Sequence, residues 1–159
     1  VQFAARLPED ELPPQVQGIL REVLPQLVRN AVVHGIEQPG VRAQFRKPEA
    51  GALRLDIAHD QDGTVEVRLS DDGRGIVLPE LRERIARQRS DVAQLSDHEV
   101  LGHIFDPAFS TATEVTEHAG RGMGLSLVRK AVEDAGAKLR VLTQPHMCTT
   151  FILRFGIAV

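Results

Sequence analysis

The sequence contains no tryptophan, no tyrosine and only one cysteine, Cys148, among its 159 residues. A single thiol cannot form an internal disulfide, and this composition suits a reducing compartment, so we expect a cytoplasmic protein. No apolar run is long enough to span a bilayer, and the N-terminus lacks the order of a basic and then an apolar segment. We therefore expect no direct insertion into a membrane.

The sequence also has little net charge, with a formal value of -3. This value argues against a nucleic-acid-binding protein, whose affinity rests on neutralising phosphates. The length and the 42% of apolar residues suit one globular domain with its own core. Since the chain begins at Val1 without a methionine, we expect residues 1–159 to be a single domain cut from a larger protein.

Glycine is concentrated where Gly120, Gly122 and Gly124 alternate ahead of an amphipathic segment, residues 126–135. Backbone without Cβ atoms lets a phosphate approach closely, and the following helix N-terminus carries a partial positive charge. The stretch therefore predicts a phosphate-binding loop that opens a helix. A mobile glycine-rich turn is the alternative, since short glycine motifs also match by chance.

Apolar residues from 16 to 32 follow a helical period for more than four turns. Pro25 lies within this pattern, so we expect a kink or a break between two helices there. Gln26, Asn30 and His34 follow one another at four-residue spacing and so project from one stripe of the helix. A solvated helix face would explain three such residues, and only the rest of the chain favours a binding site.

Alternating apolar residues predict two β-hairpins. The alternating segments are 53–57, 65–69, 139–141 and 151–155. Residues 1–7 indicate an edge strand, whereas 36–51 show no periodicity and are expected to form a loop. Helical patterns occupy residues 79–88 and 97–104.

The first hairpin leads into Asp71, which is followed by Asp-Gly-Arg-Gly-Ile at residues 72–76. An acidic residue at a strand end beside Gly-x-Gly can turn its carboxylate toward a pocket while the backbone folds tightly next to it. A calcium-binding turn or an ordinary Asp-Gly turn are alternatives. The loop lacks the further oxygen ligands that calcium needs, which disfavours the first of these.

Four motifs in this order make the sequence resemble the GHKL superfamily of ATP-binding domains, and within it the catalytic domain of chemotaxis-type sensor histidine kinases. The motifs are an N box at 27–37, a G1 box at 71–75, an F box at 105–111 and a G2 box at 120–124. The His-Gly-Ile-Glu that closes the N box points to the chemotaxis-type branch. The resemblance implies an α/β fold, a two-layer sandwich of a mixed sheet with helices on one face, and a flexible ATP lid around residues 106–119.

The resemblance also implies a role for individual residues. Asn30 would ligate Mg²⁺, for which a carboxamide oxygen is suited because it adds no negative charge beside the triphosphate. His34 would reach the phosphates, and Asp71 would accept a hydrogen bond from the adenine amino group. The other residues expected around ATP are Gly73, Gly75, Ile76, Arg84, Phe109, Ser110, Thr111, Gly120, Arg121, Gly122, Met123, Gly124 and Leu125, with Arg84 a weaker candidate for the phosphates.

Two residues depart from the chemotaxis-type N box, which usually carries a histidine at the position of Gln26 and an acidic residue at that of Val33. Glutamine cannot act as a base, so a proton-accepting role at position 26 is in doubt. Phosphoryl transfer depends mainly on positioning and charge neutralisation, and neither change need abolish it.

The function implied is binding of Mg-ATP and transfer of its γ-phosphoryl group to a histidine on a separate phosphotransfer domain. The expected partners are that domain and the response regulator of the same pathway, with coupling or receptor proteins reached through further domains. A catalytically weak regulatory module that only binds nucleotide is the main alternative. A GHKL ATPase of the chaperone or topoisomerase kind is a third, against which the His-Gly-Ile-Glu and Gly-Arg-Gly-Met-Gly stretches argue.

Overall fold

The computed structural model describes residues 1–60, 62–107 and 124–156, and its strands form one five-stranded sheet in the order β1-β2-β3-β5-β4. The strands are β1 (Gln2–Arg6), β2 (Ala52–His59), β3 (Val65–Asp71), β4 (Lys138–Gln144) and β5 (Cys148–Phe155). β1 pairs with β2 in parallel, and the other three pairs are antiparallel. The two expected hairpins and the edge strand are confirmed, and the sheet is mixed.

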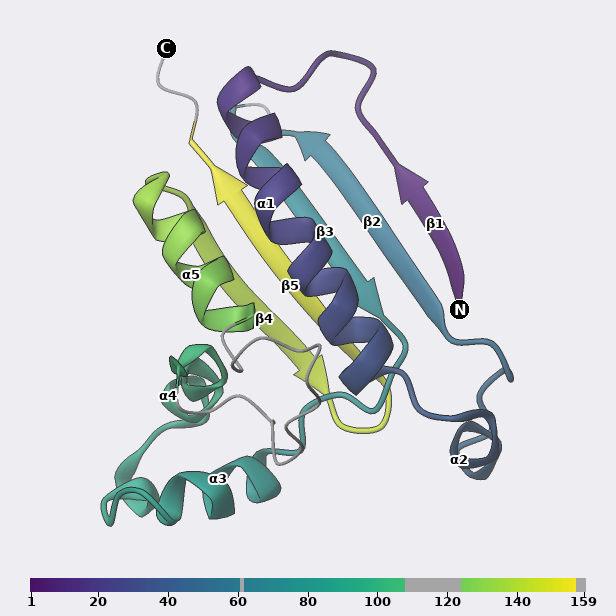
Figure 1. Cartoon of the computed structure of the whole chain (residues 1–159), viewed down its shortest axis with the longest axis vertical. Coiled ribbons are helices and arrows are strands. Elements are labelled where there is room, and N and C mark those ends of the chain that lie inside the picture. The colour runs from purple at the N-terminus through teal and green to yellow at the C-terminus, as the bar shows by residue number, and fades with distance from the viewer. Residues whose placement is uncertain (61, 108–123, 157–159) are drawn as a thin grey trace, which may run out of the picture.

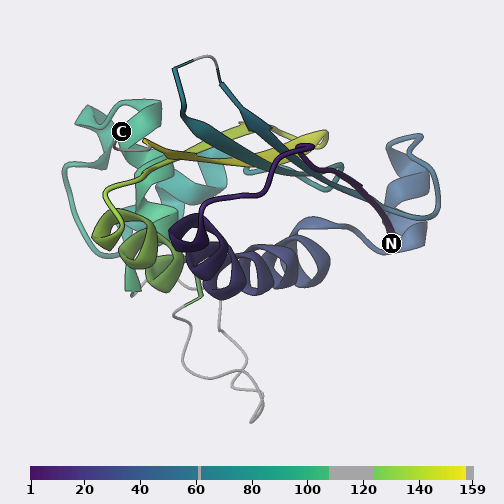
Figure 2. The ribbon, with the colours of Figure 1, turned by 90° about the horizontal axis from the view of Figure 1, so that it is seen from above.

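Two long helices, α1 (Pro14–Asn30) and α5 (Gly124–Asp134), lie side by side over one face of this sheet (Figure 1). Seen from above, the helices and the sheet form two separate layers (Figure 2). The main core fills the space between these layers, with Val23, Leu27 and Val132 from the helices against Leu69 and Leu153 from the sheet. The expected α/β architecture is confirmed.

Helix α1 runs unbroken through Pro25, so the predicted break between two helices is wrong. Its buried residues Val16, Leu20, Val23 and Leu27 recur at helical spacing and bind the helix to the sheet. Pro25 lies on the exposed side of α1, where water can reach the carbonyl that the proline leaves without a donor. Packing of the opposite face therefore outweighs the local cost of the proline.

Past Asn30 the helix widens into a π-helical turn, Ala31–Gly35, instead of ending. The N–H of Ile36 donates to the carbonyl of Ala31, five residues earlier, at 2.8 Å. Such wide turns occur often at functional sites, because they rotate side chains out of the ordinary helical register. The helical segment thus extends through the N box to Gly35, as expected.

The segment 36–51, expected to be a loop without regular structure, contains a short helix, α2 (Pro39–Gln44), which corrects that expectation. Pro39 begins this helix at a position where its missing N–H costs nothing. The residue that α2 buries is the charged Arg42, so no apolar period marks this helix in the sequence. The helix lies beyond the C-terminal end of α1 (Figure 1).

A second, smaller core joins α3 (Leu78–Ala86) to α4 (Asp97–Gly102). Short 3-10 turns, Val92–Gln94 and His103–Phe105, precede and follow α4. The buried members of this core are Leu81, Ile85, Val92 and Val100. Both expected helices are confirmed, and Ser96 caps α4 in a reciprocal capping box with Glu99.

Several expected features lie outside the part of the chain that the structure describes. They comprise most of the lid at 106–119 and the candidate residues Phe109, Ser110, Thr111, Gly120, Arg121, Gly122 and Met123. The helix predicted behind the glycines is confirmed, since α5 begins at Gly124. Among the described residues, no helix combines the length and the apolar character needed to cross a bilayer.

Leu27 provides a test of the main core, because its side chain has an exposed fraction of 0%. Leu27→Ala should lower the free energy of unfolding by about 2–5 kcal/mol, through lost burial and the cavity left behind. Urea unfolding followed by circular dichroism measures this, since the chain has no tryptophan. Leu127→Ala on α5, where the leucine is 47% exposed, is the matched control and should cost about 1 kcal/mol or less. Equal losses in the two variants would contradict the assigned core.

Candidate functional site

The end of the N box packs directly against the carboxylate of Asp71, at the end of β3. Asp71 is only 5% exposed, although it is an acidic residue. A Cβ atom added to Gly35 would lie 3.3 Å from Oδ1 of Asp71, so glycine gives the carboxylate its space. The structure thus brings together two motifs that are separated by more than thirty residues of sequence.

The turn after Asp71 is fixed by main-chain hydrogen bonds. The N–H of Gly73 donates to Oδ1 of Asp71 (2.9 Å), and the N–H of Arg74 donates to the carbonyl of Gly35 (2.8 Å). A Cβ atom on Gly73 would lie 2.2 Å from that carbonyl oxygen, which no real side chain tolerates. The close approach of the Gly35 backbone therefore already requires glycine at position 73. A close approach of Gly73 to a bound base remains a prediction.

Gly75 closes the other side of this turn against the loop between β4 and β5. Its φ angle is +64°, and an added Cβ atom would lie 2.2 Å from the carbonyl oxygen of Gln144. The N–H of His146 donates to the carbonyl of Arg74 at 2.6 Å. The G1 box is thus held between the N box on one side and the second hairpin on the other.

Burial raises the pKa of Asp71 to about 6, because the charged carboxylate is removed from water. Hydrogen bonds from the backbone of Gly73 and Thr149 lower this pKa, whereas the nearby carboxylates of Asp72 and Glu37 raise it. The balance leaves a carboxyl group that titrates close to neutral pH. Above that pH, Asp71 is a buried hydrogen-bond acceptor with a negative charge.

Gln26 lies beside the N-terminus of α5. A Cβ atom on Gly124 would lie 3.4 Å from Oε1 of Gln26, so the polar stripe of α1 meets the start of the helix that follows the glycines. The N–H groups at a helix N-terminus attract anions, and the first turn of α5 contains no acidic residue. Leu125, half-buried, anchors this turn to the main core.

Asn30 and His34 lie on the same helical segment between these two places. Asn30 is half-buried at the end of α1, and His34 is exposed in the π-helical turn. Gln26 and Gly35 are nine residues apart, roughly 13 Å along a helix axis. A ligand that touched both the α5 N-terminus and Asp71 would have to span this length of the helical segment, which contains Asn30 and His34.

Two further candidates lie around the second core. The N–H of Ile76 donates to Oγ1 of Thr143 (2.8 Å), and its half-buried side chain packs against the α3–α4 cluster. Arg84 lies in the last turn of α3. Neither side chain is part of the contacts that join Gly35, Asp71 and Gly73.

The donor groups of the described residues limit which metal ions this site can hold. Within residues 1–60, 62–107 and 124–156, no group of three histidine, cysteine or acidic side chains is arranged to hold a metal ion. Mg²⁺ is usually bound through one or two protein oxygens together with water and substrate phosphates, so it needs no such group. The carboxamide of Asn30 fits this limited requirement.

Sequence reasoning missed the charged cluster beneath the G1 turn. Arg42 is fully buried and forms ion pairs with Glu37 and Asp72, and Lys47 joins Glu37. Glu37 and Asp72 belong to the N and G1 boxes, but Arg42 and Lys47 come from a segment that resembles an ordinary solvated loop, where no periodic signal marks them. Only the many charged residues in this part of the sequence could have indicated such a cluster.

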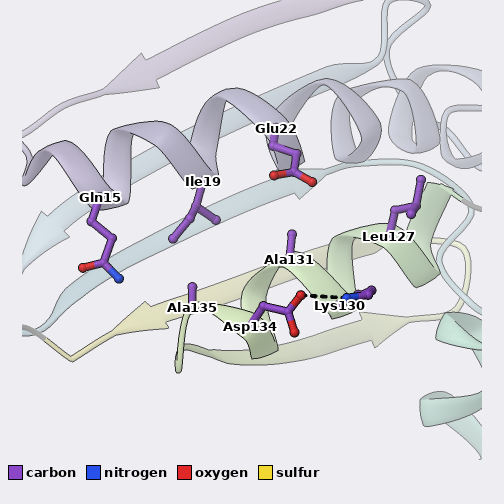
Figure 3. Close-up of a pocket in the computed structure, with 8 residues that line it drawn as sticks. All are labelled: Gln15, Ile19, Glu22, Leu127, Lys130, Ala131, Asp134 and Ala135. Carbon is purple, nitrogen blue, oxygen red and sulfur yellow. Dashed lines mark hydrogen bonds and ion pairs between the residues drawn. The ribbon is translucent and has the colours of Figure 1, made fainter.

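A groove of about 510 Å³ also opens between α1 and α5, away from Asp71. Figure 3 shows Gln15, Ile19 and Glu22 on one wall and Leu127 and Ala131 on the other. Among the residues that the structure describes, none of those expected to bind ATP lines this groove. The groove is therefore distinct from the place where the motifs converge.

Comparison with known proteins gives a match to the family described as histidine kinase-, DNA gyrase B-, and HSP90-like ATPase, over residues 15–158. Chemotaxis protein CheA of Cereibacter sphaeroides is 39% identical over 84% of this chain and 20% of its own length. The gliding motility regulatory protein of Myxococcus xanthus is 37% identical over 86% of this chain and 18% of its own. Chemotaxis protein CheA of Halobacterium salinarum is 32% identical over 100% and 24%.

Solved structures of histidine kinases are also similar to this chain. The catalytic domain of histidine kinase ThkA aligns with a TM-score of 0.52 and 26% identity over 88% of this chain and 67% of its own. The blue-light activated histidine kinase of Erythrobacter litoralis has a TM-score of 0.57 over 98% of this chain and 35% of its own, and its 15% identity shows the fold alone. The chain spans about a fifth of the length of the curated relatives it matches.

The raised pKa of Asp71 predicts a pH dependence of stability. The folded chain binds this proton more tightly than the unfolded chain, so the contribution is full below about pH 4 and is lost as the pH rises through 6. At pH 7 the ionised carboxylate should cost on the order of 3 kcal/mol, since a tenfold change in proton affinity equals about 1.4 kcal/mol. Asp71→Asn, which cannot ionise, should escape this loss.

Urea unfolding of both proteins between pH 4 and pH 7 measures the effect. The stability of Asp71→Asn relative to the unsubstituted chain should rise across this range. A difference that stays constant with pH would show that Asp71 titrates normally.

Proposed function

The chain belongs to the histidine kinase-, DNA gyrase B-, and HSP90-like ATPase family, and we propose that it binds Mg-ATP and transfers the γ-phosphoryl group to a histidine on a separate phosphotransfer domain. Relatives named chemotaxis protein CheA support the kinase branch of the family. The observation that carries the proposal is the buried carboxylate of Asp71 against Gly35, reached along α1 from the N-terminus of α5.

Asp71 would select the base. With a pKa of about 6, its carboxylate is ionised at pH 7 and accepts a hydrogen bond from the amino group of adenine. Guanine carries a carbonyl oxygen at the same place, so two acceptors would face each other in a buried site. A buried acceptor left without a donor costs about 1–3 kcal/mol, which is enough to discriminate between the bases.

The phosphates would lie at the other end, where the N-terminus of α5 meets α1. Bound Mg²⁺ supplies positive charge that offsets the charge of the phosphates. Asn30 would give the metal a carboxamide oxygen, and His34, exposed in the π-helical turn, would reach a phosphate oxygen. The N–H groups of the first turn of α5 would bind the anion as helix N-termini do.

Gln26 would act by positioning. Its Oε1 atom faces the start of α5, so the carboxamide lies where the phosphate chain would end. Phosphoryl transfer through a loose transition state depends on alignment and electrostatic stabilisation more than on a base. A neutral acceptor imidazole already has a lone pair for attack, and the glutamine need only orient the acceptor or a water molecule.

The acceptor histidine and the response regulator would belong to other domains or chains, because this chain corresponds to 18–24% of its curated relatives. Coupling or receptor proteins would likewise be contacted through those domains. Labelled ATP incubated with this chain and candidate phosphotransfer domains is the direct experiment. Label on an acceptor histidine supports the proposal, and its absence with every candidate argues against transfer.

A second function is favoured by the two departures in the N box. Gln26 cannot act as a base, and Val33 is an exposed apolar side chain at a position where the resemblance to the chemotaxis-type N box implies an acidic residue. A domain with these changes could bind ATP tightly and regulate a partner without transferring phosphate. Tight ATP binding without any transfer would favour this regulatory module.

Asn30→Ala tests the metal site. The variant should weaken Mg-ATP binding and abolish transfer while the fold is retained, because the metal loses a protein oxygen next to the phosphates. Isothermal calorimetry measures affinity, since the chain offers neither tryptophan nor tyrosine as a probe. Gln88→Ala, which removes an exposed carboxamide after α3, is the control and should bind normally. Unchanged affinity and transfer in Asn30→Ala would remove Asn30 from this role.

Substitutions of Gln26 test how this residue acts in phosphoryl transfer. If it only positions groups, transfer should follow the titration of the acceptor histidine, near its usual pKa of about 6.5. Gln26→Ala should lower the rate without moving this profile, and Gln26→His should raise it little. A rise of a hundredfold or more in Gln26→His, within the ~10²- to 10⁴-fold range of general base catalysis, would show that the chain lacks a base and favour the regulatory module.

A further inference from the structure

Arg42 on α2 has an exposed fraction of 0%, and each of its three guanidinium nitrogens donates to an oxygen of the protein. Nε donates to the carbonyl of Pro48 (2.7 Å), Nη1 to Oε2 of Glu37 (3.1 Å) and Nη2 to Oδ2 of Asp72 (2.7 Å). Nη1 also lies 3.3 Å from the main-chain carbonyl of Asp72. The planar fork of an arginine is suited to such a set of fixed acceptors.

Lys47 completes the cluster from the other side. Its ammonium donates to Oε1 of Glu37 (2.7 Å) and to the main-chain carbonyls of Asp72 (2.8 Å) and Gly73 (2.6 Å). Two cations thus meet two carboxylates, and the charges balance. The two cations together fix both peptide carbonyls that follow Asp71.

These contacts hold the backbone on which Asp71 depends without touching its carboxylate. Oδ1 of Asp72 also accepts from the N–H of Ala52 (2.8 Å), which ties the turn to β2. The N–H of Gly73 in turn donates to Oδ1 of Asp71. A shift of the Asp72 and Gly73 peptides would therefore rotate the Asp71 carboxylate.

We propose that Arg42 and Lys47 are positioning residues for adenine specificity: by fixing the two peptide groups after Asp71, they hold its carboxylate in the orientation that accepts a hydrogen bond from an amino group on the base. This inference rests on the proposed binding of ATP. It assigns a role in base recognition to a segment, residues 42–47, that none of the four motifs includes.

The same cations are paired with the two acidic neighbours of Asp71. Burial raises the pKa of Asp71 most, and the nearby carboxylates of Asp72 and Glu37 raise it further. Arg42 pairs with both of these carboxylates, and Lys47 pairs with Glu37. Stability alone does not require the cluster, because apolar residues of similar volume often replace buried ion pairs without loss.

The test compares the affinities for Mg-ATP and for Mg-inosine triphosphate, in which a carbonyl replaces the amino group of the base. Calorimetry is carried out on this chain and on Arg42→Lys, which keeps the charge and loses the fork. Lys47→Met is the second variant, and its partly exposed site, 12% for the side chain, makes folding less dependent on it. Arg54→Lys is the matched control, an exposed arginine paired with Asp56 on the outer face of the sheet.

The unsubstituted chain and Arg54→Lys should prefer ATP. In Arg42→Lys and Lys47→Met the preference should fall by about tenfold, as expected for one lost buried hydrogen bond, with the affinity for inosine triphosphate nearly unchanged. Equal losses for both nucleotides, or an unchanged preference in a folded variant, would overturn the inference and leave the proposed function standing. Failure of the unsubstituted chain to bind ATP would overturn both. If Arg42→Lys does not fold, Lys47→Met decides.

Discussion

The charge balance beneath the G1 turn is the constraint on which the shape of the site depends. Arg42 and Glu37 are buried together, whereas their partners Lys47 and Asp72 keep some contact with water. Breaking a buried pair such as Arg42–Glu37 by removing one partner typically costs about 3–5 kcal/mol, because the other charge remains in a low dielectric. Since Glu37 is the last residue of the N box and Asp72 follows Asp71, the cluster links the end of the N box to the G1 turn.

Glycine serves a related purpose on the upper side of the same turn. Gly35, Gly73 and Gly75 each lie where a Cβ atom would meet protein atoms, at 3.3, 2.2 and 2.2 Å. The motif glycines therefore bring three separate stretches of backbone into contact before any ligand is considered. This explains how a turn with few apolar side chains of its own can be rigid.

Long periodic segments could be predicted from the sequence, and short or charged ones could not. Strands β2, β3, β4 and β5 and helices α1, α3 and α5 could be predicted because each turns apolar residues toward a core. Strand β1 is exposed throughout, and only its weak alternation in the sequence indicated it. The break predicted at Pro25 is wrong because the energetic cost of a proline inside a helix depends on whether that side of the helix is exposed to water. Helix α2 buries a charged residue instead of apolar ones, and a buried Arg42 cannot be distinguished from a solvated arginine until its partners are known. The order of the motifs in the sequence was enough to place Asp71 in one site with the N box. That Asp71 is buried could be seen only in the folded structure.

The pairing of β3 with β5 has a consequence for how the chain acquires its site during synthesis. Asp71 lies opposite Thr149 in the sheet, and Gly75 packs against the carbonyl of Gln144. The N box and the G1 turn leave the ribosome long before these partners do, since synthesis proceeds from the N-terminus. The growing chain therefore contains both motifs before it contains the second hairpin, against which they pack. Asp71 takes its buried position only when β5 has emerged and inserted between β3 and β4.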